Sequence, residues 1–229
     1  MAEAIQIDKN TWRFEDGFVR FFLLEGNDKA VMIDSGMNCL DAMALAKKIT
    51  DKPLMLLNTH GDVDHVSGTG SFSQIYMHRL DFEDCGIASK FPDTALAPID
   101  DGDIIDPGNR PLKIIHIPGH TKGSVAILDV SRRVLYSGDS VQKGYIFMFG
   151  PQREPEKYEA SLDKLIALKS DYDFIYASHD EFSLSGDYAQ KVKSAWQSVR
   201  AGEVPFEYAD MFGNKIKSYT TKDCGFFIG

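Results

Sequence analysis

The segment LMLLNTHGDVDH, residues 54–65, joins a short apolar run directly to a cluster of polar side chains. Its first part, Leu54–Leu57, is apolar throughout, which predicts a short strand buried within a covered sheet. The second part, Asn58–His65, contains two imidazoles and two carboxylates. Because α/β folds place their chemistry beyond the ends of buried strands, this segment predicts a functional site at one edge of a sheet.

The spacing of the polar residues in this segment suits metal binding. We expect the segment to be a loop, because the glycines within and after it discourage a long helix. In a loop, the alternate residues His60, Asp62 and Asp64 can converge on one side. His65 then takes a different angle, so one segment can supply ligands to two metal positions. Imidazoles and carboxylates together suit zinc, iron or manganese.

Three further predicted strands also end in short polar motifs. These motifs carry His120 in PGHT (residues 118–121), Asp139 in SGD (137–139) and His179 in SH (178–179). Four of the six histidines therefore follow predicted strands. A lone histidine is more often structural than a ligand, and we expect His116 to be structural and His78 to lie at the surface. Four histidines beside carboxylates predict a metal centre.

The remaining pattern predicts one α/β domain over residues 1–229. It has two similar halves of about residues 1–97 and 98–229, each with strands followed by a helix and another strand. We expect hairpins from Phe18–Leu24 with Ala30–Ile33 and from Val125–Leu128 with Val134–Tyr136, and helices over Met37–Thr50, Glu156–Leu168 and Tyr188–Ala201. The final residues, Tyr219–Gly229, are expected to pack back onto the body of the protein.

Composition excludes several classes of protein. The chain is 43% apolar and 26% charged, which is typical of a globular domain and not of a disordered chain or a coiled coil. Its net charge of −9 disfavours nucleic acid as a partner. No apolar run is long enough to cross a membrane. The polar N-terminal residues and the three widely spaced cysteines fit neither a secretory signal nor a disulfide scaffold, so we expect a cytoplasmic protein.

In this order and at these spacings, the motifs resemble those of the metallo-β-lactamase superfamily, and in particular its glyoxalase II-like hydrolases. The tripeptide Asp34-Ser35-Gly36 is similar to the family's early Asp-Thr-Gly element, which supports the metal ligands without binding the metal itself. The resemblance covers about residues 15–182. It implies a four-layer αββα sandwich with two divalent metal ions at one edge of its two sheets.

The resemblance also implies a ligand set. One ion is held by His60, Asp62 and His120. The other is held by Asp64, His65 and His179, and Asp139 bridges the two ions. A water or hydroxide between the ions is then the nucleophile, which Asp64 helps to orient, so that Asp64 and Asp139 are the expected catalytic residues.

One residue departs from the family pattern, which has histidine at the position of Asp62. An additional carboxylate makes the site less positive by one charge and favours ions that prefer oxygen ligands. We therefore expect iron or manganese to compete with zinc. The superfamily's flavodiiron proteins also carry a carboxylate at this place, so the departure does not imply an inactive site.

The main hypothesis is a dinuclear metal-dependent hydrolase that acts on a small ester, thioester, lactone or related molecule. Lys143 and Tyr145 are candidate substrate contacts because they follow Asp139 closely, and Phe147–Phe149 can line an apolar pocket. One alternative is a diiron redox protein, an oxygen or nitric oxide reductase that needs a separate electron donor. Another alternative is a metal-bound sensor without turnover. The oligomeric state, the substrate and the native metal are not predicted.

Overall fold

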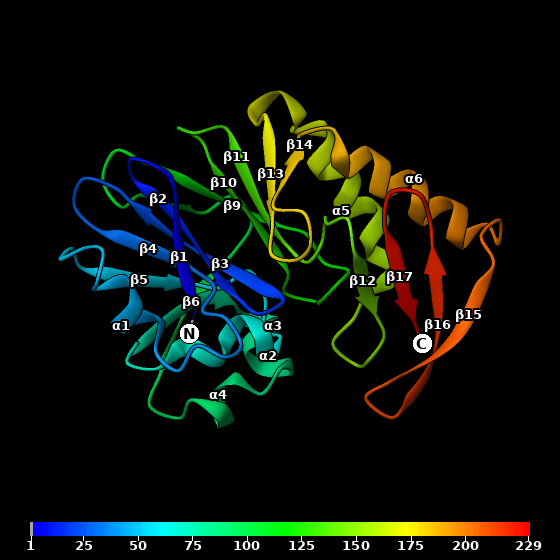
Figure 1. Cartoon of the computed structure of the whole chain (residues 1–229), viewed down its shortest axis with the longest axis horizontal. Helices are drawn as coiled ribbons and strands as arrows, with labels where there is room; N and C mark the ends of the chain where they lie inside the picture. The colour runs from blue at the N-terminus through cyan, green and yellow to red at the C-terminus, as the bar shows by residue number, and fades with distance from the viewer. Residues whose placement is uncertain (1) are drawn as a thin grey trace.

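The computed structural model describes residues 2–229, whose strands form three sheets (Figure 1). The first sheet has seven strands in sequence order. These are β1 (Glu3–Asp8), β2 (Thr11–Asp16), β3 (Val19–Glu25), β4 (Ala30–Ile33), β5 (Leu54–Leu57), β6 (Gln74–His78) and β7 (Ala95–Ile99). Strands β1 to β4 pair antiparallel and β4 to β7 pair parallel, so the predicted hairpin at β3–β4 is confirmed.

Short helices cover one face of this first sheet (Figure 1). They are α1 (Ala42–Ala46), α2 (Val63–Val66), the 3-10 turn η1 (Ser67–Thr69), α3 (Arg79–Asp84) and α4 (Ile87–Lys90). The helix expected over Met37–Thr50 is shorter than predicted. It begins after Asp41, whose side chain accepts a hydrogen bond from the Ala44 backbone N–H at 3.2 Å and so fixes the start of the helix.

The second sheet has the strand order β14-β13-β11-β10-β9-β8. Its strands are β8 (Ile104–Ile105), β9 (Leu112–His116), β10 (Val125–Asp129), β11 (Val134–Gly138), β13 (Phe174–Ala177) and β14 (Ser183–Ser185). The predicted hairpin of β10 and β11 is confirmed, with Ile127 opposite Tyr136. Strand β13 then pairs parallel with β11, so the segments after these two strands emerge at the same edge.

The two sheets pack face to face through apolar side chains. Phe22, Ile33 and Leu57 of the first sheet form one buried cluster with Ile114 and Ile127 of the second. The outer face of the second sheet is covered by α5 (Pro155–Ala167) and α6 (Tyr188–Arg200) (Figure 1). The layers are therefore helix, sheet, sheet and helix, which confirms the expected αββα sandwich.

A third sheet, which the sequence did not predict, lies beside this sandwich (Figure 1). Its strand order is β12 (Tyr145–Met148), β17 (Gly225–Ile228), β16 (Asn214–Thr220) and β15 (Phe206–Met211). Tyr145 and Gly225 are opposite each other where β12 pairs parallel with β17. The final strand thus joins the segment that follows Asp139. Among the helices of residues 2–229, none combines the length and the apolar character needed to span a membrane.

Candidate metal centre

The predicted ligand residues come together at one edge of the two facing sheets. His60 follows β5, and Asp64 and His65 lie on α2. The other residues follow strands of the second sheet: His120 comes after β9, Asp139 after β11 and His179 after β13. The predicted loop is partly wrong, because residues 63–66 form one helical turn, in which the His65 N–H donates to the Asp62 carbonyl at 3.0 Å.

His60, Asp62 and His120 form the first ligand group. The Nε2 atoms of His60 and His120 are 3.2 Å apart. Oδ2 of Asp62 lies 3.2 Å from Nε2 of His120 and 3.7 Å from Nε2 of His60. Three atoms with lone pairs therefore face one common point.

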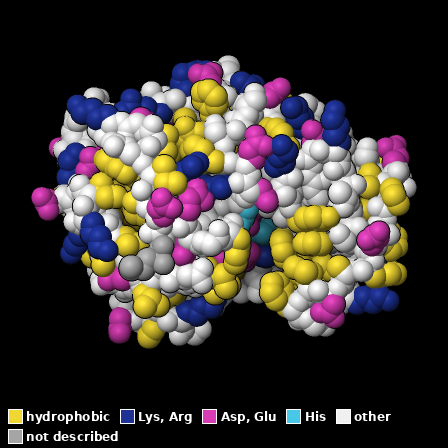
Figure 2. Space-filling view, viewed as in Figure 1, with side chains coloured by type: hydrophobic (Ala, Val, Ile, Leu, Met, Phe, Trp, Pro, Cys, Tyr) yellow, Lys and Arg dark blue, Asp and Glu magenta, His cyan; other side chains and the backbone are white. Residues whose placement is uncertain are grey.

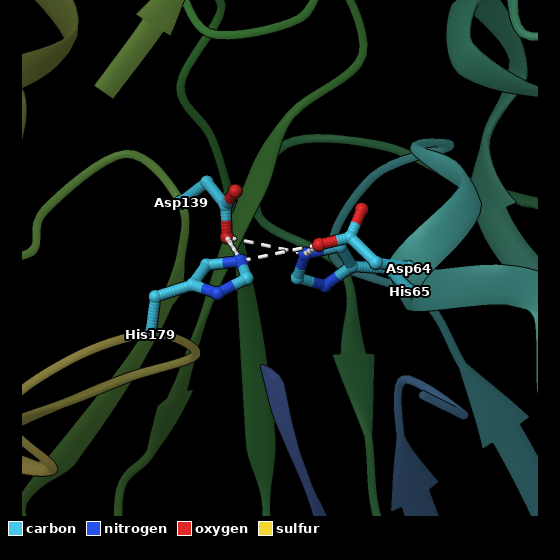
Figure 3. Close-up of side chains that lie close together, drawn as sticks. All are labelled: Asp64, His65, Asp139 and His179. Carbon is cyan, nitrogen blue, oxygen red and sulfur yellow. Dashed lines mark ion pairs between the residues drawn. The ribbon is translucent and has the colours of Figure 1, made fainter. Parts of the chain in front are cut away.

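Asp64, His65, Asp139 and His179 form the second ligand group, and Figure 3 shows them pointing toward one another. Oδ1 of Asp139 lies 3.2 Å from Nε2 of His65 and 3.2 Å from Nε2 of His179. Oδ2 of Asp64 lies 3.5 Å and 3.3 Å from the same two nitrogens. The other oxygen of Asp139 faces the first group, 3.7 Å from Nε2 of His120, so one carboxylate touches both groups.

These separations fit divalent ions. Tetrahedral zinc with bonds of about 2.0–2.2 Å places neighbouring ligand atoms about 3.3–3.6 Å apart, close to the spacing in both groups. Nε2 of His65 and Oδ1 of Asp139 are buried and, among residues 2–229, have no hydrogen-bond partner. Because buried polar atoms are rarely left unpaired, the donor set fits a bound cation.

The outer nitrogen of each of these histidines is held by another group. Nδ1 of His60 contacts Oγ1 of Thr59 at 3.0 Å, and Nδ1 of His65 contacts Oδ2 of Asp34 at 2.9 Å. Nδ1 of His120 and of His179 donate to the carbonyl oxygens of Phe147 and Phe18 at 2.9 and 2.8 Å. An Nδ1–H bonded in this way leaves Nε2 unprotonated and aimed at the metal position.

Asp34 supports both groups, as the resemblance implied. Its Oδ2 contacts His65 directly and accepts a hydrogen bond from the Thr59 hydroxyl at 2.8 Å, so that hydroxyl is left to accept from His60. Its Oδ1 accepts from the Thr59 backbone N–H at 2.7 Å. Asp34 has a φ of 63°, in the left-handed region that few residues other than glycine adopt. This backbone strain marks a position held for its side chain.

Gly138 allows the segment carrying Asp139 to approach the first sheet closely. Its φ is +52°, and a Cβ there would lie 2.9 Å from Oγ1 of Thr59. A larger residue would be strained and would displace the hydroxyl that holds His60.

The charges of the two groups differ. Burial opposes a charge on His65 and His179, but the surrounding carboxylates, Asp139 first, raise the pKa of both imidazoles, and that of His179 to about 10. In the first group, burial and then the charge of Arg153 lower the pKa of His120. The carboxylates of the second group therefore favour a positive charge at its centre, which a bound cation would supply in place of protons. The lowered pKa of His120 favours the neutral form in which an imidazole binds a metal.

Arg153 is a site residue that sequence reasoning missed. Its Nη1 and Nη2 donate to Oδ1 and Oδ2 of Asp62 at 3.0 and 2.6 Å. Arg153 lies in the turn before α5, outside every motif, and is separated from Asp62 by 91 positions. No local signal in the sequence pointed to this contact.

The ligand groups open into a cleft of about 730 Å³. Figure 2 shows histidine at the floor of a hollow with hydrophobic side chains gathered beside it. The cleft is lined by apolar residues from two regions of the chain. Phe18, Met37 and Val63 come from the segments of the first sheet and its helices, and Tyr145, Phe147, Phe212 and Phe227 come from the strands and turn of the third sheet. Gln142, Gly144, Asp180 and Arg153 line it as well.

The two candidate substrate contacts differ in position. Tyr145 lines the cleft, its ring stacks on Phe227 with centroids 4.3 Å apart, and its hydroxyl is bonded to Thr220 at 2.6 Å. Lys143 is exposed, pairs with Glu181 at 2.6 Å and is not among the cleft-lining residues. A role for Lys143 in substrate binding stays a prediction.

Comparisons with known proteins agree with this geometry. A family model described as "Metallo-beta-lactamase superfamily" matches residues 15–179. Acyl-coenzyme A thioesterase MBLAC2 of Homo sapiens is 26% identical over 186 residues, which cover 64% of this chain and 67% of the relative. Hydroxyacylglutathione hydrolase of Pseudomonas putida is 29% identical over 189 residues, which cover 79% and 68%. The solved structure of a metallo-beta-lactamase from Pontibacter korlensis has a TM-score of 0.71 at 15% identity and covers 86% of this chain and 99% of its own.

Proposed function

The chain belongs to the metallo-β-lactamase superfamily and is a metal-dependent hydrolase, and we propose that its substrate is a thioester with an apolar acyl group. The observation that carries this proposal is the position of the two ligand groups at the floor of an apolar cleft. Relatives named as an acyl-coenzyme A thioesterase and a hydroxyacylglutathione hydrolase support the thioester bond as the target.

We further propose that the two ligand groups hold two divalent ions, which Asp139 links. When bound, such ions would supply an activated water and would polarise the carbonyl under attack. The protein's own contribution is position and charge. Asp64 faces the cleft and would accept a hydrogen bond from the attacking water, which orients the water toward the acyl carbon. Asp34 and Thr59 keep the imidazoles of the centre in the ligand tautomer.

The walls of the cleft support an apolar acyl group. Phe227 stacks on Tyr145 and packs edge-on against Phe147 with centroids 5.0 Å apart, so three aromatic rings form one wall. Val63, which precedes Asp64 in the chain, is half exposed and also lines the cleft. Burying one methylene between such walls contributes about 0.8 kcal/mol, or about fourfold in kcat/KM when the contact persists in the transition state.

The cleft has few groups that could bind an anionic thiol carrier such as coenzyme A or glutathione. Within residues 2–229, Arg153 is the one lysine or arginine among the residues lining the cleft, and both its Nη atoms are bonded to Asp62. The phosphates of coenzyme A and the carboxylates of glutathione would therefore meet no unpaired lysine or arginine among the described residues that line the cleft. We propose that recognition rests on the acyl group and that the thiol group leaves toward solvent.

A series of neutral thioesters tests this proposal. Acyl chains from acetyl to decanoyl on N-acetylcysteamine should show kcat/KM rising with length, and the same acyl group on coenzyme A should change it less than about tenfold. Phe227→Ala should flatten the series, whereas Phe174→Ala, an exposed phenylalanine of β13 that does not line the cleft, should not. A preference for acetyl, or a large advantage of coenzyme A, would contradict the proposal.

A second candidate function is a diiron redox protein, and the carboxylate of Asp62 in the first group favours it. Elemental analysis of protein purified without added metal separates the two candidates. About two zinc or manganese ions per chain, together with thioester turnover, support the hydrolase. About two irons with absorbance that changes on reduction support redox chemistry, which oxygen and nitric oxide consumption with an electron donor would then test.

A further inference from the structure

Arg153 and Asp62 form a two-pronged pair inside the candidate metal centre. Both Nη atoms of the guanidinium donate to the carboxylate, at 3.0 Å to Oδ1 and 2.6 Å to Oδ2. The two side chains are only 10% and 21% exposed. A planar fork of this kind fixes both the position and the orientation of a carboxylate, which a lysine could not do.

The backbone holds Arg153 and His120 together. The Glu154 N–H donates to the Gly119 carbonyl at 2.9 Å, and the Lys122 N–H donates to the Gln152 carbonyl at 2.9 Å. These bonds tie the turn before α5 to the loop that carries His120. The guanidinium and one imidazole of the first group are therefore placed by the same pair of loops.

The Asp62 oxygen that lies nearest to Arg153 also faces the histidines of the first group. Oδ2 of Asp62 is 2.6 Å from Nη2 of Arg153 and 3.2 Å from Nε2 of His120. The same carboxylate oxygen therefore contacts both the guanidinium and a candidate ligand nitrogen. Nε of Arg153 is buried without a hydrogen-bond partner within residues 2–229, so the side chain is committed to Asp62 through its Nη atoms.

The pair also balances charge. Asp62 stands where the superfamily pattern has a neutral histidine, so the centre carries one additional negative charge. The guanidinium of Arg153 adds one positive charge beside it. With Arg153 counted, the net charge of the centre equals that of a centre with histidine at this position and no arginine.

We propose that Arg153 is a positioning residue that acts as one unit with Asp62. It turns the carboxylate toward His60 and His120 and offsets its charge, so that a carboxylate serves where a neutral imidazole usually does. This inference rests on the proposal that the first group holds a metal ion. If Arg153 and Asp62 act as one unit, substituting either residue alone should weaken metal binding, and substituting both together should restore it.

A cycle of four proteins tests the pairing: the full chain, Asp62→His, Arg153→Gln and the double variant. Each is loaded with cobalt, dialysed at a fixed free concentration and assayed for metals per chain and for the visible cobalt spectrum. Asp62→His removes the carboxylate that pairs with the buried guanidinium of Arg153. Arg153→Gln removes the guanidinium that pairs with the buried carboxylate of Asp62. Each single variant should bind the first-group ion about 10- to 100-fold more weakly and fall from about two ions per chain to about one. The double variant should return to about two.

The controls separate this inference from the proposals that precede it. Arg133→Gln removes a comparable two-pronged pair with Asp173 on the surface and should leave metal binding unchanged. An ion retained in the second group shows that a variant is folded. If Asp62→His alone binds two ions as tightly as the original chain, or if the double variant is no better than the weaker single variant, Arg153 is not paired with Asp62 in function. If the unaltered chain binds less than one ion, the proposed centre itself is wrong.

Discussion

Two sets of histidines in this protein show what makes an imidazole a ligand candidate. The four in the centre each bind an outer partner through Nδ1 and aim Nε2 at other ligand atoms. The other two, His78 and His116, stack face to face with ring centroids 4.2 Å apart. His116 bonds to the Lys122 carbonyl through Nε2, and His78 accepts from the Leu80 N–H through Nδ1.

The two sets of histidines differ in whether their ring nitrogens converge with other ligand atoms, and not in how deeply the imidazoles are buried. His78 is largely buried, so the expectation of a surface residue is wrong, yet the carboxylate with which it pairs, that of Asp100, is 3.9 Å away. In the centre, several nitrogens and carboxylate oxygens meet within 4.8 Å. Burial alone therefore does not distinguish a ligand histidine from a packing histidine, whereas shared direction of the lone pairs does.

The largest expected effect comes from a matched pair of substitutions. His120→Gln removes a ligand of the first group, so metal content should fall from about two ions per chain to about one, and kcat/KM should fall more than about 100-fold. His116→Gln, four residues earlier on the chain, should change neither. Elemental analysis and thioester assays of the two variants provide the comparison. Equal losses in both would remove the distinction between the two sets of histidines.

The next largest effect is expected for the residues that contact the Nδ1 atoms of the ligand histidines. Asp34→Asn replaces the carboxylate that fixes His65 with a group that also donates, so the second group should bind its ion about 10- to 100-fold more weakly. Competition with a chromophoric chelator measures this affinity. Asp16→Asn is the matched control, because that buried carboxylate accepts backbone N–H bonds from Met37, Asn38 and Cys39 and touches no ligand. It should lower the melting temperature and leave affinity unchanged.

A smaller effect is expected at Thr59. Thr59→Val keeps the shape of the side chain but removes the hydroxyl between His60 and Asp34, so His60 loses its fixed tautomer. The first-group ion should bind about 10-fold more weakly, since the backbone N–H of residue 59 still holds Asp34. The same chelator competition measures it, and a loss confined to the second group would contradict the assignment.

The smallest effect is a pH dependence outside the centre. Burial and the charge of His116 lower the pKa of His78 below its usual value. The unfolded chain then binds more protons, so this contribution to stability is present above about pH 6.5 and is lost as the pH falls through the lowered pKa. His78→Phe keeps the stacked ring without the proton. The difference in melting temperature between pH 7.5 and 5.5 should shrink by about 2 °C or less, and an increase would show the sign to be wrong.

Much of the fold followed from local pattern. The helix expected over Glu156–Leu168 is α5, Pro155–Ala167, because proline suits a first helical turn and the apolar residues repeat along one face. The hairpin at β10–β11 was predicted from two short apolar runs around a turn. The third sheet was not predicted, because β12 and β17 pair across about 80 residues and neither strand carries a local signal of the other.

By itself, the sequence determined which residue types end the buried strands and in what order, because strand and helix periods are set by backbone geometry within a few residues. It therefore predicted all seven residues that the structure brings together in the two groups. The division of these residues between the two groups is the one that the resemblance implied. The pairing of Arg153 with Asp62 and the aromatic wall built from β12 and β17 were decided by the tertiary structure alone. Those contacts join residues far apart in the chain, whose meeting depends on how the layers pack and not on any local pattern.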